Sequence, residues 1–159
     1  MQLPISIKMR LQHQHESLLD LIDGLTDEQL RRPIIAGKWS VFENIVHLQT
    51  YQHTFITRVN KVLEERNPVF ARYTAEADPM FLDNCGLPTK RITEDLFNTR
   101  KEIRSRILSL KETELARTGQ HPAFGQLTLL QWLHFFLLHE AHHLFTIFKL
   151  AAELRTAKR

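Results

Sequence analysis

Two histidines four residues apart are the first candidates for chemistry in this sequence. His139 and His143 lie in the apolar segment 127–152, and residues four apart on an α-helix occupy one face, one turn above the other. The same face carries apolar residues at helical spacing, which are Trp132, Phe136, Ile147 and Leu150. Both imidazoles should therefore point inward, where a polar group needs a partner. Because neutral imidazole is the commonest metal ligand, the spacing predicts that the two histidines share a divalent metal ion.

A third ligand is needed, because catalytic zinc sites usually take three protein ligands and a water molecule. His47, expected on the inner side of another helix, is the best candidate, although taken alone it would be interpreted as a hydrogen-bonded core histidine. His15 and His53 are weaker candidates. The predicted metal site therefore consists of His47, His139 and His143.

The remaining histidines fit such a site less well. His142 lies three residues after His139 and could replace His143, but it points about 100° away from that side chain. His121 and His134 are expected in a loop or at the surface.

Residues 139–143 also match the His-Glu-x-x-His pattern of zinc metalloproteases, in which the glutamate is a general base. Those enzymes need a further ligand beyond the helix, and only sixteen residues follow His143. The extended metzincin pattern would place glycine and histidine where Thr146 and Lys149 stand. A protease is therefore not favoured. Glu140 is expected to support a ligand or to pair with a neighbouring helix rather than to act as a general base.

Length and composition indicate a globular protein. The 159 residues suffice for one domain, expected to span residues 1–159, and contents of 43% hydrophobic and 25% charged residues are ordinary for such a domain. A single cysteine, Cys85, excludes an internal disulfide and fits a reducing cytosol. The N-terminal residues lack the layout of a signal peptide, and no apolar run reaches the ~18 residues of a membrane span. A cytoplasmic location without a membrane partner is expected.

The charge pattern does not indicate a nucleic-acid partner. The net charge of +3 is mild, and much of it comes from the tail residues Arg155, Lys158 and Arg159. A basic run alternates with acidic residues and is interpreted as a solvated helix face; its basic members are Lys90, Arg91, Arg100, Lys101, Arg104 and Arg106. No helix-turn-helix spacing accompanies it, so no nucleic-acid binding is expected.

Apolar residues with a 3.6-residue period predict four long helices. The first runs from about residue 5 to 25, ends near Gly24 and carries His15 in a gap of its apolar stripe. The second starts at the capping box Ser40–Glu43 and stops before Pro68, because the residue before a proline is disfavoured in a helix.

The second half of the chain supplies the other two long helices. The third covers about residues 89–110, and the fourth starts at the capping box Thr128–Gln131; a further box at Thr26–Gln29 predicts a short helix. Residues 68–90 are expected to form a long crossover and residues 119–125 a loop, and no segment alternates convincingly as a strand. The predicted fold is all-α, a four-helix bundle with the long crossover between its second and third helices.

These motifs together resemble the DinB superfamily, also called YfiT-like. The resemblance covers nearly the whole chain and rests on a combination of segments, namely Gly37-Lys38-Trp39-Ser40, His47, residues 121–128, Gln131-Trp132 and residues 139–143. It implies a four-helix bundle, often dimeric, in which His47, His139 and His143 bind a divalent metal commonly assigned as zinc or nickel. The usual pattern continues with arginine or glycine and then glutamine, whereas Leu144, Phe145 and Thr146 stand here.

The resemblance also implies activities. Characterised members include transferases and isomerases that use a small thiol (bacillithiol, mycothiol or glutathione), and others are described as metal-dependent hydrolases. The expected chemistry is Lewis-acid catalysis on a small-molecule substrate at an open three-histidine site, with no catalytic residue assigned. Three neutral histidines leave the ion its full charge, which a thiolate would offset, so activation of a low-molecular-weight thiol is favoured. The alternatives are a hydrolase that uses metal-bound water and a non-catalytic metal-binding stress protein. Zinc or nickel is the expected metal, and iron or manganese would also fit.

A homodimer is expected from the apolar surface of the fourth helix. Apolar residues occur on more than one side of it, among them Phe135, Leu138, Leu144 and Phe148. A helix that is apolar over more than about a 100° stripe usually buries a second face, and a two-fold dimer is the commonest closed oligomer.

Overall fold

Three capping boxes start helices where the sequence predicts them. They are Thr26 with Gln29, Ser40 with Glu43, and Thr128 with Gln131. At the second box, the Ser40 hydroxyl accepts the Glu43 backbone N–H at 3.1 Å and the Glu43 carboxylate accepts the Ser40 N–H at 2.7 Å. Each box satisfies two backbone donors that the first helical turn leaves unpaired.

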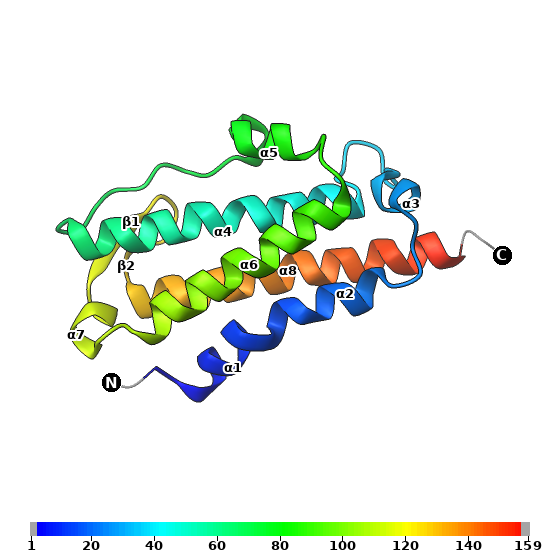
Figure 1. Ribbon diagram of the computed structural model, residues 1–159. Helices are drawn as coiled ribbons and strands as arrows, with labels where there is room; N and C mark the ends of the chain where they lie inside the picture. The colour runs from blue at the N-terminus through cyan, green and yellow to red at the C-terminus, as the bar shows by residue number, and fades with distance from the viewer. Residues whose placement is uncertain (1–2, 157–159) are drawn as a thin grey trace.

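The computed structural model describes residues 3–156 (Figure 1). Residues 1–2 and 157–159 of the expected domain, with Lys158 and Arg159 of the basic tail, lie outside the described residues. The helical elements are α1 (Ile5–His13), the 3-10 turn η1 (Gln14–Glu16), α2 (Ser17–Ile22), α3 (Asp27–Arg31), α4 (Val41–Glu64), η2 (Ala75–Ala77), α5 (Pro79–Asn84), α6 (Thr89–Leu108), α7 (Glu112–Leu115) and α8 (Leu129–Thr156). The strands are β1 (Thr118–His121) and β2 (Gly125–Thr128).

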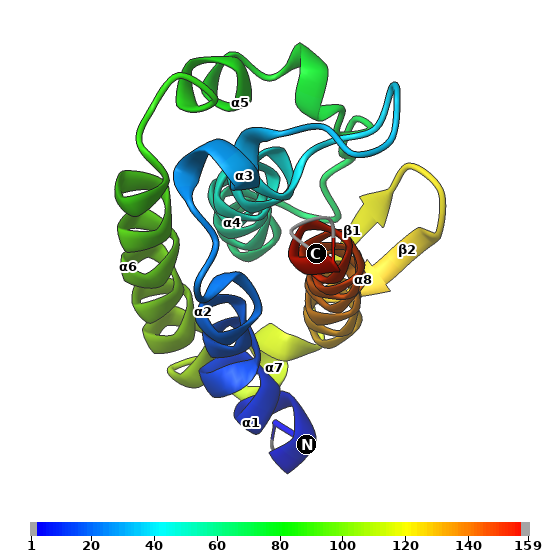
Figure 2. The same ribbon diagram turned by 90° about the vertical axis from the view of Figure 1, so that its right-hand side faces the viewer.

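The long helices form the predicted four-helix bundle, with α1, η1 and α2 acting together as the first. Seen along its length in Figure 2, α4 packs between α6 and α8, and α1–α2 closes the opposite side between the same two helices. In Figure 1, α4 and α6 run in the same direction, antiparallel to α2 and α8. The chain must therefore return along the whole bundle between α4 and α6, which is why the crossover is long.

The crossover contains more structure than the sequence analysis predicted. Asp78 caps α5, because its Oδ1 accepts the Met80 N–H at 2.9 Å and Pro79 suits the first helical position. Phe81 of α5 is buried, with its ring centroid 5.4 Å from that of Trp39. This short helix covers the outer side of α4.

The prediction of a loop at residues 119–125 without strands was wrong. Strands β1 and β2 pair antiparallel, from Thr118 opposite Thr128 to His121 opposite Gly125. Gly125 has a φ of +69°, and a Cβ at Gly119 would lie 2.8 Å from Val62 Cγ2, so both glycines suit a tight hairpin packed on α4. Four-residue strands are too short to show alternation, which explains why the pattern did not reveal them.

The core is divided into two apolar clusters by a polar layer. One cluster includes Leu11 and Phe55, whose ring stacks on Phe136 at 4.2 Å, and the other includes Leu18 and Ile147. Between them along the helices lie buried polar side chains, namely His15, His47, Gln52, Arg100 and Glu140. This layer also interrupts the first helix at η1, where a continuous helix was predicted.

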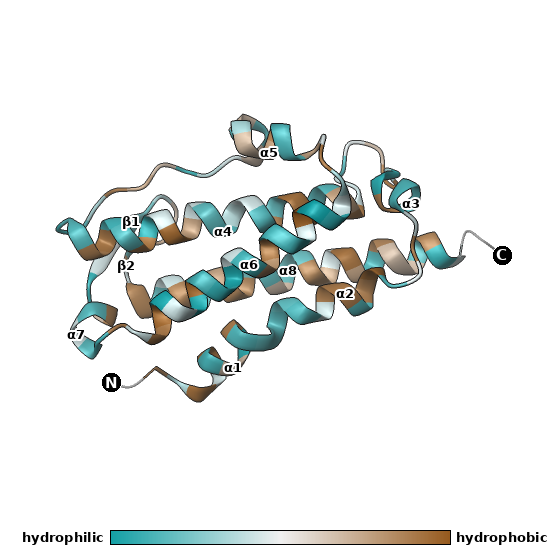
Figure 3. Ribbon diagram, in the orientation of Figure 1, coloured by the Kyte–Doolittle hydropathy of each residue, from teal (hydrophilic) through white to brown (hydrophobic). Residues whose placement is uncertain are grey.

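The prediction that the basic run of α6 lies on a solvated face is mostly correct, and the side of α6 facing the viewer in Figure 3 is largely hydrophilic. Arg100 is the exception, because its side chain is only 1% exposed and lies in the polar layer. None of the described helices is long and apolar enough to cross a membrane.

The outer side of α8 is apolar, though not through all of the expected residues. Leu138, Phe145 and Phe148 are exposed. Leu144, expected on this second face, is instead buried in the core with Ile147, and Phe135 is half-buried.

Candidate metal centre

Helices α4 and α8 bring three histidines together at the polar layer. His47 on α4 faces His139 and His143 on α8, and one nitrogen of each ring lies within 4.8 Å of the others. The Nε2 atoms of His47 and His139 are 3.0 Å apart, and the His47 and His143 ring centroids are 4.4 Å apart. The four-residue spacing on α8 aims both of its imidazoles at His47, as the sequence predicted.

Asn44 fixes the tautomer of His143. Its Nδ2 donates to the Ser40 carbonyl at 2.8 Å, which leaves Oδ1 as the acceptor for His143 Nδ1–H at 2.9 Å. The proton on Nδ1 leaves a lone pair on Nε2, the form in which imidazole binds a metal. Asn44 is buried one turn before His47, and sequence reasoning missed it, because nothing marks an asparagine as a ligand's partner until its neighbour is known.

Burial keeps the three imidazoles neutral. It lowers the pKa of His47, His139 and His143 to about 3 each, and neighbouring histidines add smaller effects in the same direction. At neutral pH all three rings therefore have a free lone pair.

The cluster fits a divalent metal ion. The Nδ1 atom of His47 is buried without a hydrogen-bond partner among residues 3–156, and its Nε2 faces another imidazole nitrogen at 3.0 Å. Two imidazole nitrogens at this distance share either a proton, in a hydrogen bond, or a cation. One nitrogen of each of the three rings lies within 4.8 Å of the others, so the three imidazoles could bind the same ion.

The weaker histidine candidates lie elsewhere. His15 is buried beside Arg100, with its Nδ1 3.4 Å from Arg100 Nη1, and burial followed by the Arg100 charge lowers its pKa to about 4. His53 faces α6, with its Nε2 3.2 Å from a carboxylate oxygen of Asp95. His142 and His134 are exposed.

His121 is half-buried at the end of β1 rather than in a loop. Its Nδ1 accepts the backbone N–H groups of Ala123 and Phe124 at 3.1 and 3.2 Å, so the proton lies on Nε2. The ring lies against Phe124 and Phe135, with centroids 4.6 and 4.9 Å away.

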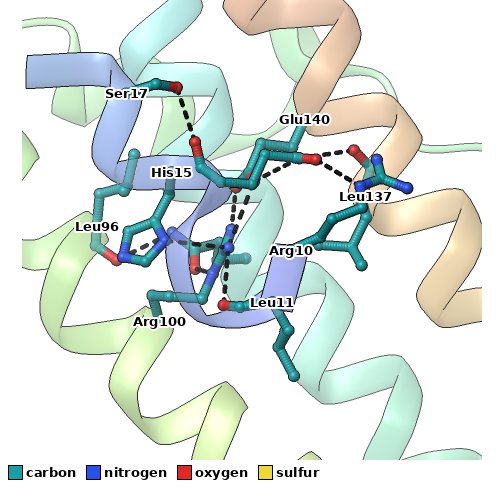
Figure 4. Close-up of polar contacts among 10 residues, drawn as sticks. Arg10, Leu11, His15, Ser17, Leu96, Arg100, Leu137 and Glu140 are labelled. Carbon is teal, nitrogen blue, oxygen red and sulfur yellow. Dashed lines mark hydrogen bonds and ion pairs between the residues drawn. The ribbon is translucent and has the colours of Figure 1, made fainter. Parts of the chain in front are cut away.

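Glu140 pairs with a neighbouring helix, which is one of the two roles that its sequence position predicted (Figure 4). It is 3% exposed and forms an ion pair with Arg100 of α6. Its Oε1 also accepts from Gln14 Nε2 at 2.8 Å, and Arg100 Nε donates to Gln52 at 2.9 Å. Because these contacts occupy its carboxylate, Glu140 is not placed to act as the general base that the metalloprotease pattern requires.

A cavity of about 820 Å³ opens beside His47 and His139. That volume is within the range of small-molecule sites. Its lining near the histidines is aromatic: Tyr51 lies 4.3 Å from the His139 ring and Trp39 lies 4.9 Å from the His47 ring, between centroids. The hairpin and the crossover supply another wall, which includes His121, Phe124 and Tyr73. Sequence reasoning missed this wall because it is built from segments that were interpreted as connections.

The chain is similar to known proteins over most of its length. The profile of the DinB superfamily matches residues 10–147. The YuaE protein of Bacillus subtilis is 31% identical over 135 residues, covering 77% of this chain and 83% of that protein. A protein of Oceanobacillus iheyensis, whose name proposes a metal-dependent hydrolase, is 27% identical over 127 residues, covering 80% and 73% of the two chains.

Two solved structures share the fold. YfiT from Bacillus subtilis, described as a probable metal-dependent hydrolase with an unusual four-helix bundle topology, superposes with a TM-score of 0.81 at 22% identity, over 94% of this chain and 86% of that one. The four-helix bundle protein TT2238 gives a TM-score of 0.66 at 20% identity, over 89% and 95%.

Proposed function

This chain belongs to the DinB superfamily, and on that premise we propose that it is a metal-dependent enzyme acting on a small-molecule substrate. One observation carries the proposal: three neutral imidazoles converge at the wall of a cavity large enough for a substrate. A purely structural metal site would close its coordination sphere with protein ligands, whereas His47 and His139 also line an open cavity.

His47, His139 and His143 would hold the ion, and Asn44 would orient His143. A divalent metal ion supplies a Lewis acid, which lowers the pKa of a bound water or thiol toward neutrality. The aromatic rings of Trp39 and Tyr51 pack against the histidines and keep bulk water away from them, which strengthens electrostatic interactions inside the site. Zinc or nickel suits three imidazole nitrogens.

Hydrolysis is the reaction we propose first. Its support is the similarity to the Oceanobacillus protein and to YfiT, both of which have been described in those terms. Activation of a small thiol is the second candidate, and the observation that favours it is the neutral ligand set. No described carboxylate belongs to the cluster, so a bound thiolate would offset charge that these histidines leave uncompensated.

Cobalt-substituted protein distinguishes the two reactions. For a hydrolase, the visible spectrum should titrate with a pKa near neutrality and stay unchanged when a small thiol is added. For a thiol-activating enzyme, the thiol should produce a sulfur-to-metal charge-transfer band at neutral pH.

The control for this experiment is the protein's own thiol. Cys85 is half-buried in the crossover, where it packs on the apolar cluster of Leu18 and Ile147. The Cys85→Ser variant should give the same spectra as the wild type. If neither a water-derived pKa nor a thiol band appears in cobalt-loaded protein, the site is closed to substrates and the enzyme proposal is wrong.

A further inference from the structure

Arg58 is a buried cation without an acidic partner. Its side chain on α4 is 8% exposed, and its Nη2 donates to the Ala71 carbonyl at 3.0 Å while Nη1 donates to the Tyr51 hydroxyl at 3.4 Å. None of the ion pairs described within residues 3–156 includes it. Buried arginines are normally paired, as Arg100 is with Glu140, because an uncompensated charge is costly to remove from water.

The guanidinium lies within reach of the histidine cluster. Tyr51 connects the two, because its ring lies 4.3 Å from the His139 ring and its hydroxyl contacts Arg58. Both Tyr51 and Arg58 line the cavity beside His47 and His139. A single tyrosine side chain therefore bridges the cation and the cluster.

Other polar groups of the cavity support an anion at this end. His121 lines the same wall, and its Nε2–H is a donor because Nδ1 already accepts two backbone N–H groups. Arg72 and Glu76 also line the cavity, but both are exposed, so water and salt screen their opposite charges. Arg58, in contrast, is buried, and its guanidinium lies 5.5 Å from the rings of Phe70 and Trp132 but has no carboxylate partner in the described ion pairs.

We infer that the substrate carries an oxyanion group, a carboxylate or a phosphate, which Arg58 binds while the reacting end lies at the three histidines. Guanidinium is the side chain best suited to such groups, because its planar set of donors matches two oxygens at once. Only two of its five N–H donors are used by described residues. The inference rests on the proposed function for the identity of the reacting end, but the anion site itself does not depend on metal.

Tryptophan fluorescence offers a direct test, because the chain has two tryptophans and both are near the cavity. Trp39 lines it, and the Trp132 ring lies 5.5 Å from the Arg58 guanidinium. Titration with benzoate, phenyl phosphate and the neutral benzamide, in chelator-treated and zinc-loaded protein, compares probes of similar size. At least one anion should bind about tenfold more tightly than benzamide in chelator-treated protein, as expected for a charge-assisted hydrogen bond.

Variants attribute this preference to one residue. Arg58→Gln should abolish the preference for the anion, and Arg58→Lys should retain part of it. Arg106→Gln, which removes the same charge from an exposed position of α6, should leave it unchanged. A melting curve shows whether each variant is folded, and if Arg58→Gln is not, Arg58→Lys and the probe comparison in the wild type decide the question.

Equal affinity for the anions and benzamide in the wild type, or an undiminished preference in folded Arg58→Gln, would overturn the inference. If the wild type shows the preference but takes up no zinc when zinc is added, the proposed function is refuted and the anion site still stands.

Discussion

Replacing Glu140 by glutamine should destabilise the fold while leaving the three histidines in place. The substitution keeps the shape of the side chain but removes its charge, and the Arg100 guanidinium would then stay buried without a counter-charge. The side chains of Arg100 and Glu140 are 1% and 4% exposed, so water cannot replace the lost partner.

The magnitude follows from that burial. Breaking a buried ion pair by removing one partner costs about 3–5 kcal/mol. A domain of this size has a total stability of roughly 5–15 kcal/mol, and each kcal/mol shifts its melting temperature by about 2–4 °C. Glu140→Gln should therefore melt roughly 6–20 °C below the wild type.

Thermal denaturation followed by circular dichroism in the presence of a chelator measures this effect without a contribution from metal binding. Glu153→Gln is the matched control, because it makes the same change at an exposed position of the same helix and should shift melting little. The double variant Glu140→Met with Arg100→Met should recover most of the loss, since an apolar pair can replace a buried ion pair. If Glu140→Gln has the melting temperature of the wild type but loses activity, Glu140 is a general base and does not stabilise the fold through Arg100.

Three further predictions concern titration, ligand orientation and assembly. Chelator-treated protein should lose stability as the pH falls from 6.5 to 5, because the buried histidines stay neutral in the folded state and bind protons in the unfolded state. Each histidine lowers the free energy of unfolding by up to about 1.4 kcal/mol per pH unit, and a free energy of unfolding, measured with urea, that does not change with pH would contradict this. Asn44→Ala should weaken zinc binding by about 10–100-fold in chelator competition while Asn44→Asp retains it, and equal affinity in all three proteins would show that the Asn44–His143 hydrogen bond is unimportant. The exposed residues Leu138, Phe145 and Phe148 should form a dimer interface, so sedimentation should show a wild-type dimer and a Phe145→Glu monomer; a monomeric wild type at micromolar concentration would refute the interface.

Sequence periodicity located α4 and α8, which carry the cluster, because each has a buried stripe and a capping box. The i, i+4 geometry of His139 and His143 follows from helix geometry alone, so it could be predicted before any packing was known. His47 required the further assumption that α4 faces α8, which its stripe of buried residues made reasonable.

Features that depend on tertiary contacts were not predictable in the same way. Arg100 looked like one more member of a charged helix face, since only its partners on η1, α4 and α8 distinguish it from its neighbours. Asn44 and Arg58 gain their importance from groups distant in sequence, and the hairpin that carries His121 is too short to produce a periodic signal.

Metal content per chain is the most direct test of the three-histidine site. Protein purified without a histidine tag and analysed by inductively coupled plasma mass spectrometry should contain about one divalent ion per chain, as expected for three protein ligands. His47→Ala, His139→Ala and His143→Ala should each lose most of the metal, whereas His121→Ala and His142→Ala should keep it, because their rings lie outside the cluster. Full metal occupancy in folded His47→Ala would contradict the assignment.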